Sequence, residues 1–148
     1  MMISIRNFTE YDVMTLKQLQ YTNLEESEII DIIREWEIKE YQGKYFEMFA
    51  VVDNENIVGY ISIMEHSKNI ISYGVNIYDR YRRKGYAQSG SKLVFGYAKN
   101  RGYKIAVLQV RVDNAASLGL HMKLGFDIDH KYVNSKGNEV YCLIKSLL

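Results

Sequence analysis

Apolar residues in the first third of the chain recur at two different spacings. Ile3 and Ile5 alternate with polar neighbours, which predicts a short strand. Thr9 then has the character of a helix N-cap with Asp12 in the first turn, and apolar residues follow at helical spacing. A second helix is expected after Ser27. Its apolar stripe is formed by Ile29, Ile33 and Trp36.

The middle of the chain is rich in β-branched and aromatic residues. Runs at 46–52 and 57–64 are separated by the turn sequence DNEN, which predicts a hairpin. A third strand is expected at 70–78. Three antiparallel strands are therefore predicted before the chain returns to helix.

The second half alternates helix and strand. Helical spacing over 87–101 ends at Gly102, the segment KIAVLQVRV predicts a strand covered on both faces, and a short helix over 115–124 stops at Gly125. The last residues predict a hairpin that turns around Lys136, Gly137 and Asn138. The element order β-α-α-β-β-β-α-β-α-β-β predicts an α+β fold, a mixed sheet with helices packed on it. With 148 residues, we expect residues 1–148 to form a single domain.

Composition narrows the possible partners. Nineteen Lys and Arg against eighteen Asp and Glu leave a formal net charge of +1, which argues against binding nucleic acid or an anionic membrane through the field of the whole molecule. No stretch approaches the roughly 20 apolar residues of a membrane span, and the start of the chain lacks the apolar region of a signal peptide. A single cysteine, Cys142, excludes an internal disulfide and reads as an inert thiol in a buried strand. We expect a cytoplasmic protein.

A cationic glycine turn lies between the strand at 70–78 and the following helix. It contains Arg82, Arg83, Lys84 and Gly85, and Ala87 follows. The first N–H groups of a helix lack internal acceptors and carry partial positive charge, so such a turn can hold a phosphate. The sequence is neither a P-loop nor the dinucleotide fingerprint, and a solvated surface turn fits the same residues.

Two linked motifs resemble those of the GNAT superfamily of acyl-CoA N-acyltransferases. RRKGYA matches the family's [QR]-x-x-G-x-[GA] loop at Arg82, Gly85 and Ala87. VDNAASLGLHMKLGF matches its N-x-x-[AS]-x-x-L-Y-x-K-x-G-F segment but carries His121 where tyrosine is usual. The other matching positions of that segment are Asn114, Ser117, Leu120, Lys123, Gly125 and Phe126.

The resemblance implies a central, mostly antiparallel sheet with two splayed parallel central strands and helices on both faces. Acetyl-CoA would be the cosubstrate, with no metal. Its pantetheine arm would lie in the splay, and a bulge in the strand at 70–78, near Gly74, would aim an N–H at the thioester oxygen; a plain strand glycine fits Gly74 as well. The residues implied to hold the arm are Val75, Asn76, Ile77, Tyr78, Asn114 and Ser117, and those implied to hold the pyrophosphate are Arg82, Arg83, Lys84, Gly85, Tyr86 and Ala87.

Catalytic roles are less determined by the resemblance. His121 stands where the family places the tyrosine that protonates the leaving thiolate, and an imidazolium could substitute; a histidine that only packs fits the same position. Glu65 and Tyr73 are candidates for the general base, and each is also interpretable as structural. An acidic bias around the second helix is compatible with a cationic amine acceptor or with a solvated helix face.

Three functions follow from these patterns. The first is an N-acetyltransferase that moves an acetyl group to a primary amine by direct attack in a ternary complex. The second is a non-catalytic module with the same fold that binds acyl-CoA or a partner. The third is a nucleic-acid patch at the basic turn, which the near-neutral charge disfavours. A homodimer through the terminal hairpin is a further possibility.

Overall fold

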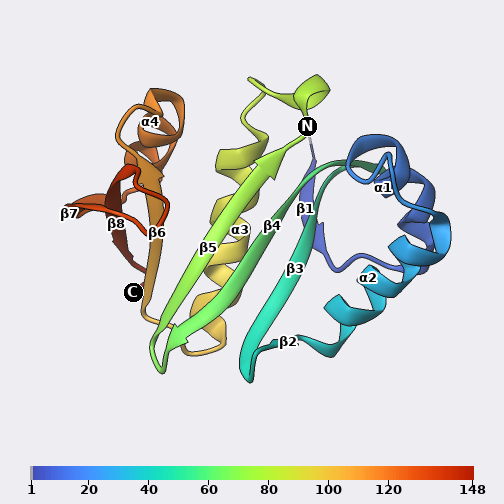
Figure 1. Ribbon diagram of the computed structural model, residues 1–148, viewed down its shortest axis with the longest axis horizontal. Helices are drawn as coiled ribbons and strands as arrows, with labels where there is room; N and C mark the ends of the chain where they lie inside the picture. The colour runs from blue at the N-terminus through green and yellow to red at the C-terminus, as the bar shows by residue number, and fades with distance from the viewer. Residues whose placement is uncertain (1) are drawn as a thin grey trace.

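The computed structural model describes residues 2–148, and it is a mixed α+β fold built on one large sheet (Figure 1). The strands have the order β1-β3-β4-β5-β6-β8-β7, and β2 pairs with β3 off this path. The strands are β1 Ile3–Arg6, β2 Glu40–Tyr41, β3 Lys44–Asp53, β4 Asn56–Ser67, β5 Ile70–Ile77, β6 Ile105–Arg111, β7 Asp127–Val133 and β8 Glu139–Ser146. The helices are α1 Val13–Leu19, α2 Glu26–Ile38, α3 Tyr86–Asn100 and α4 Ala115–Lys123, with 3-10 turns η1 Glu10–Asp12 and η2 Asp79–Tyr81.

Helices cover both faces of the sheet, as predicted. Alternate residues of β3 belong to separate cores: Val51 packs with α3, whereas Ala50 and Val52 pack with α1 and α2. This follows from the two-residue period of a strand, which sends successive side chains to opposite faces. Figure 1 shows α3 behind the centre of the sheet and α1 and α2 beside β3.

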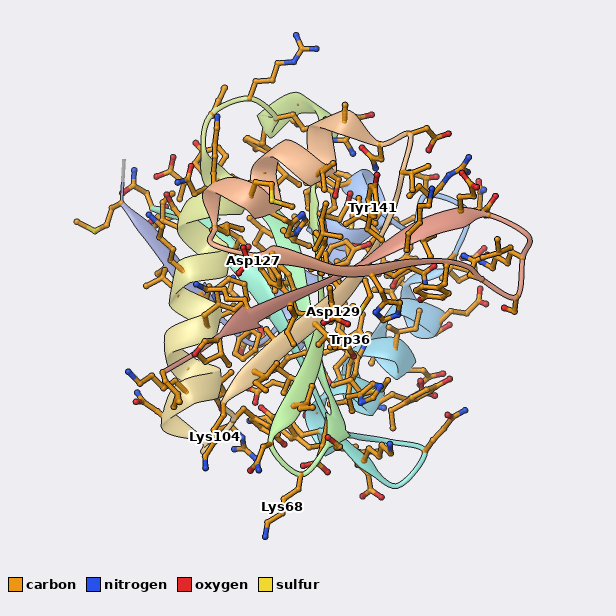
Figure 2. The ribbon with its side chains drawn as sticks, turned by 90° about the vertical axis from the view of Figure 1, so that its left-hand side faces the viewer. Trp36, Lys68, Lys104, Asp127, Asp129 and Tyr141 are labelled. Atoms are coloured by element: carbon orange, nitrogen blue, oxygen red, sulfur yellow. The ribbon has the colours of Figure 1, made fainter. Side chains whose placement is uncertain are left out.

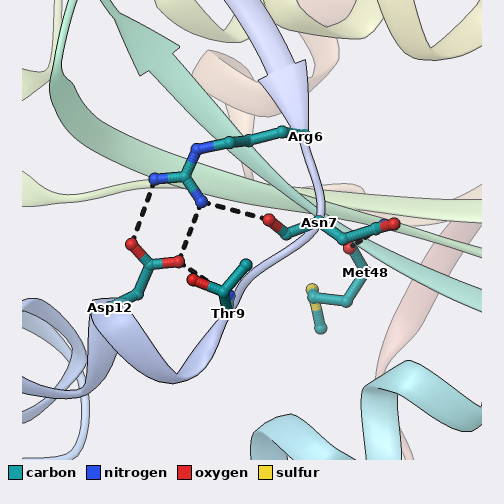
Figure 3. Close-up of polar contacts among 5 residues, drawn as sticks. All are labelled: Arg6, Asn7, Thr9, Asp12 and Met48. Carbon is teal, nitrogen blue, oxygen red and sulfur yellow. Dashed lines mark hydrogen bonds and ion pairs between the residues drawn. The ribbon is translucent and has the colours of Figure 1, made fainter.

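An ion pair fixes the connection from β1 to η1 (Figure 3). Arg6 binds both carboxylate oxygens of Asp12, at 2.8 and 3.0 Å, and the Thr9 backbone N–H donates to Asp12 at 2.8 Å. Burial by itself raises the pKa of Asp12, but the bonds from Arg6 and Thr9 outweigh it and the net pKa is lowered. The predicted cap at Thr9 is confirmed, although the first turn is a 3-10 turn.

Two details of this region differ from the sequence expectation. Helix α2 begins at Glu26, two residues earlier than a helix that follows Ser27, because Glu25 serves as its N-cap and Glu28 accepts from the Glu25 backbone N–H at 3.1 Å. The two-residue strand β2 was not expected, since two residues are too few to show a period.

The two central parallel strands begin together and then separate. β5 and β6 pair only at Ile70–Ile105, Ile71–Ala106 and Ser72–Val107. The Lys104 N–H also donates to Asn69 at 2.8 Å, and Figure 2 shows Lys68 and Lys104 at this same end of the sheet. Beyond Ser72 the strands diverge toward the end where η2 and α4 lie (Figure 1). The predicted splay is therefore confirmed.

The expectation that 104–112 is covered on both faces is wrong. Only Ala106 and Val110 of β6 are buried, whereas Gln109 and Arg111 are exposed. Those exposed side chains lie on the face of β6 that is opposite to α3. Within the sheet, β8 is the neighbour of β6 on the side away from β5.

The expected bulge near Gly74 is also wrong. β4 and β5 stay in regular register from Gly59–Ile77 to Glu65–Ile71, and the irregularity falls at His66 of β4. Gly74 sits opposite Ser62 in that register, and a Cβ added there would meet Ser62 Oγ at an ordinary 3.8 Å. The glycine is therefore not explained by backbone crowding.

The terminal hairpin forms as predicted, and its second strand, not its first, pairs with the rest of the sheet. β8 pairs with β6, and β7 lies outside it as an edge strand whose residues are all exposed. Figure 2 views this edge, with Asp127 and Asp129 on β7 and Tyr141 on β8. None of the helices within residues 2–148 is long and apolar enough to cross a membrane.

Candidate acetyl-CoA cleft

A cleft of about 880 Å³ opens where β5 and β6 diverge. One wall is the end of β5 from Tyr73 to Ile77, followed by the turn that contains Arg82, Arg83 and Gly85. The other wall is α4 with Leu108 and Gln109 of β6. The cleft therefore brings together two segments that are about thirty residues apart in the sequence, RRKGYA and NAASLGLH.

The basic turn ends in a left-handed glycine. Gly85 has φ of +82° and forms the N-cap of α3, and Arg83 also has a positive φ of 65°. No side chain caps α3, so its first N–H groups are available to a ligand at this end of the cleft. A Cβ at Gly85 would meet nothing within 4 Å, so backbone conformation rather than space explains the glycine.

Arg82 is already engaged by the protein. Its Nε donates to the Ile77 carbonyl at 2.9 Å, and its guanidinium lies 2.8 Å from Asp79 and 3.4 Å from the Asn76 side chain. These contacts tie the turn to the end of β5. A direct contact of Arg82 with a phosphate stays a prediction. The side chains of Arg83 and Lys84 are exposed, and Arg83 lines the cleft.

Tyr86 has a structural task that the sequence did not indicate. The residue is buried, and its hydroxyl donates at 2.5 Å to Asp53, the last residue of β3. Because Tyr86 is the first residue of α3, this bond fixes the helix N-terminus relative to the sheet.

The opposite wall begins with a capped helix. The Asn114 side-chain oxygen accepts from the Ser117 N–H at 3.1 Å and so caps α4. The capping bond uses the oxygen of the amide and leaves its NH₂ group for other partners. Asn114 and Ser117 both line the cleft, as the family resemblance implied.

His121 lies on the cleft-lining side of α4 and is only 2% exposed. Its Nδ1 is 2.7 Å from the carbonyl oxygen of Ser117, and its Nε2 has no hydrogen-bond partner. Its ring meets those of Tyr73 and Phe126 edge-to-face, with centroids 5.5 and 5.4 Å away. Burial lowers the pKa of the imidazole, although the bond to Ser117 opposes that shift.

The two candidate bases lie in different places. Tyr73 lines the cleft but is buried, its hydroxyl is 3.4 Å from Ser91 Oγ, and burial raises its pKa well above the usual range. Glu65 is not among the residues lining the cleft; it pairs with Ile71 near the start of β5 and accepts from the Tyr103 hydroxyl at 2.9 Å. The structure therefore brings His121 and Tyr73 together and leaves Glu65 apart.

Several cleft residues were not singled out from the sequence. They are Tyr81, Gln88, Leu108, Gln109, Ala115, Ala116 and Gly119. The alanines and the glycine belong to a run of small residues, AASLG, in the first turns of α4, and a Cβ at Gly119 would meet nothing within 4 Å. That run was the available signal that a ligand can approach this helix closely.

Cys142 lies one strand away from the cleft. It is half-buried rather than buried, and it pairs across the ladder with Gln109. Burial and the nearby Asp129 raise the pKa of the thiol, which disfavours a nucleophilic thiolate. Within residues 2–148, no three His, Cys, Asp or Glu side chains are grouped as a metal site.

Comparisons with known proteins agree with this geometry. The model of the Acetyltransferase (GNAT) family matches residues 11–126. No curated protein is recognisably similar in sequence.

Solved structures with the same fold cover nearly the whole chain. Spermidine N-acetyltransferase from Vibrio cholerae, in complex with CoA and spermine, has a TM-score of 0.80 at 15% identity, covering 98% of this chain and 95% of that one. The Salmonella typhimurium acetyl transferase that modifies the N-terminal serine of ribosomal protein L7/L12 has a TM-score of 0.80 at 16% identity, covering 97% and 94%. Ard1 from Thermoplasma volcanium has a TM-score of 0.72 at 20% identity, covering 99% and 98%. Since the family model spans well over half of the chain, this protein belongs to the GNAT acetyltransferase family.

Proposed function

We propose that the protein transfers an acetyl group from acetyl-CoA to a primary amine, by direct attack of the amine in a ternary complex. The observation that carries this proposal is the separation of β5 from β6. Beyond Ser72 the edge of β5 toward β6 has no ladder partner, so backbone groups of residues 74–77 border the cleft. An extended pantetheine arm has the amides to pair with them, in the manner of an added strand.

The ends of the cleft suit the rest of the cofactor. The pyrophosphate would sit on the uncapped N–H groups of α3 around Gly85, with Arg83 and Lys84 adding positive charge. The pantetheine arm would contact Asn114 and Ser117 on the other wall. In this arrangement the thioester would lie near Tyr73 and His121.

Calorimetric titration with CoA tests the binding half of the proposal. Gly85→Asp places a carboxylate at the proposed phosphate site, and we expect it to abolish measurable binding. Gly137→Asp is a matched control, because Gly137 has the same φ of +82° and open surroundings but lies in the β7–β8 turn. Wild-type protein that shows no CoA binding, or Gly85→Asp protein that binds like Gly137→Asp, would contradict the proposal.

A thiol-release assay tests the chemical half. Acetyl-CoA is supplied with a panel of amines that includes polyamines, peptide N-termini, lysine side chains and aminoglycosides. Release of free thiol that requires one amine class identifies the acceptor. The exposed acidic residues of α2 are compatible with a cationic acceptor and equally with a solvated helix face, and the panel separates cationic acceptors from neutral ones.

One observation favours a second function, a module that binds acyl-CoA without catalysis. The chain carries a buried histidine where the family usually has a tyrosine. CoA binding without thiol release for any amine, together with activity gained by His121→Tyr, would support that function. We also propose that the 148 residues form a single cytoplasmic domain, and that any homodimer forms through the exposed edge strand β7.

A further inference from the structure

We propose that His121 carries the proton of the attacking amine to the departing sulfur, acting first as an acceptor at Nε2 and then as the donor. This inference rests on the proposed acetyl transfer. The role expected for this position was that of a protonated side chain that only donates to the leaving thiolate. Here the neutral ring first accepts a proton from the amine. This role also requires no carboxylate at the position of Glu65.

The hydrogen bond at Nδ1 determines the tautomer. Nδ1 lies 2.7 Å from the Ser117 carbonyl oxygen, which can only accept. Nδ1 must therefore carry a hydrogen, and the neutral ring then has a bare lone pair at Nε2. The Ser117 hydroxyl, at 3.3 Å from Nδ1, can adjust to this arrangement because its hydrogen rotates.

The bare nitrogen has no partner in the protein. His121 is 2% exposed, and its Nε2 is the one buried side-chain nitrogen or oxygen among residues 2–148 that makes no hydrogen bond. Buried polar atoms are nearly always paired, so an orphan of this kind indicates a ligand or a catalytic use. Because the lone pair can only accept, the missing partner is a donor such as an amine N–H or a thiol S–H, and not the thioester oxygen.

The surroundings keep the ring neutral. Burial lowers the pKa of His121, and the groups packed around it add no negative charge. The rings that contact it are those of Tyr73 from β5 and Phe126 after α4; Phe95 from α3 packs against both of these rings, and Lys145 Nζ from β8 is 6.0 Å from the Phe95 ring. Lys123, on the same helix, is a further cation. Neutral imidazole is the form that a proton acceptor needs.

The proton transfers balance over the reaction. The amine nitrogen forms the new bond to the acetyl carbon, and its proton passes to Nε2. The carbon–sulfur bond then breaks with its electron pair on sulfur, and the imidazolium returns the proton to that sulfur. The products are the amide and the free thiol, and His121 is neutral again.

The ring must shift for this cycle to run. His121 lines the cleft, but Nε2 itself is closed off from solvent. Cofactor binding therefore has to bring the ring and the reacting atoms together. This requirement makes the proposal testable without measuring turnover.

Nitrogen-15 NMR of the histidine rings in the full-length protein reads the tautomer directly. We expect His121 to be neutral at pH 7 with the hydrogen on Nδ1, and its Nε2 resonance to move when CoA or acetyl-CoA is added. The exposed His66 and His130 serve as internal references. A hydrogen on Nε2, a charged ring at pH 7, or a resonance unchanged by saturating cofactor would overturn the proposal.

Matched variants test the kinetic role. His121→Asn keeps an N–H donor for the Ser117 carbonyl but has no titratable nitrogen, whereas His130→Asn makes the same change on β7. For His121→Asn we expect kcat to fall about 100-fold or more, with the acidic limb of the pH–rate profile lost and the KM for acetyl-CoA within about threefold. His130→Asn should leave all three unchanged.

The proton shuttle and the proposed acetyl transfer are tested by different outcomes. An active wild type whose His121→Asn variant keeps its kcat and pH profile refutes the shuttle alone. A wild type that transfers no acetyl group refutes the proposed function and the shuttle together. If His121→Asn does not fold, the NMR measurement on the wild type still decides between the two tautomers.

Discussion

Gly59 on β4 does not line the cleft, but adding one methyl group at this position should disturb the cleft. A Cβ there would lie 2.3 Å from the Asn76 carbonyl oxygen and 2.8 Å from Ile77 Cα. Ordinary carbon–oxygen contacts are roughly 3.3 Å, so β4 and β5 would have to separate by about 1 Å. Overpacking against backbone typically destabilises by about 1–3 kcal/mol, and we expect Gly59→Ala to lower the free energy of unfolding by about 2–3 kcal/mol.

The same displacement should weaken cofactor binding. Ile77 accepts the bond from Arg82 Nε at 2.9 Å, so moving the end of β5 moves the basic turn. A loss of about 1 kcal/mol in binding corresponds to roughly a fivefold higher dissociation constant for CoA. Urea unfolding and calorimetric titration measure the two effects.

Gly96→Ala is the matched control for this prediction. Gly96 is exposed on α3, and a Cβ there meets nothing within 4 Å. Replacing a glycine within a helix by alanine should stabilise by about 0.5–1 kcal/mol, so the same substitution has opposite signs at the two sites. The reasoning is refuted if Gly59→Ala unfolds within 0.5 kcal/mol of wild type, a margin typical of neutral surface changes.

Three further predictions concern single contacts. Tyr86→Phe removes the hydrogen bond that holds the start of α3 to Asp53, and calorimetry should show CoA binding weakened roughly fivefold with the fold intact. Unchanged affinity for CoA would refute the role of this hydrogen bond in positioning α3. Glu47 is buried beside Lys39, and its carboxylate accepts hydrogen bonds from Tyr45, Tyr97 and Asn7. Glu47→Gln should lower the free energy of unfolding by about 2 kcal/mol. An unchanged free energy of unfolding in urea would show that the charge is dispensable. Burial alone raises the pKa of Glu47, but these bonds lower it overall, so its contribution is complete above the unfolded pKa of about 4.3 and is lost as pH falls through the folded value. Wild-type Tm should therefore fall more steeply than that of Glu47→Gln below about pH 4.3, and parallel profiles would contradict this assignment.

Local patterns predicted most of the elements because each depends on near neighbours in the chain. The apolar stripe of α2, the hairpin around DNEN and the stop at Gly102 follow from period, turn chemistry and backbone freedom. The linked motifs also placed Gly85 and Asn114 at helix starts, and the structure puts both in the cleft walls. Such features are encoded within about fifteen residues, so the sequence alone is enough to find them.

Other features depended on contacts between distant segments. β8 lies between β6 and β7, Glu65 turns toward Tyr103 instead of the cleft, and Tyr86 reaches Asp53 across 33 positions. Strand order and side-chain partners are set by packing and hydrogen bonds that no local period records.

His121 combines both kinds of information. The sequence alone determined that an imidazole stands at the position of the family's tyrosine, within a segment that forms a short helix. Only the tertiary structure decided that this imidazole is buried against Tyr73 and Phe126, because β5 and the segment after α4 meet there. Burial lowers the pKa of the imidazole and the bond to Ser117 favours the hydrogen on Nδ1, and both are properties of the folded environment and not of the residue alone.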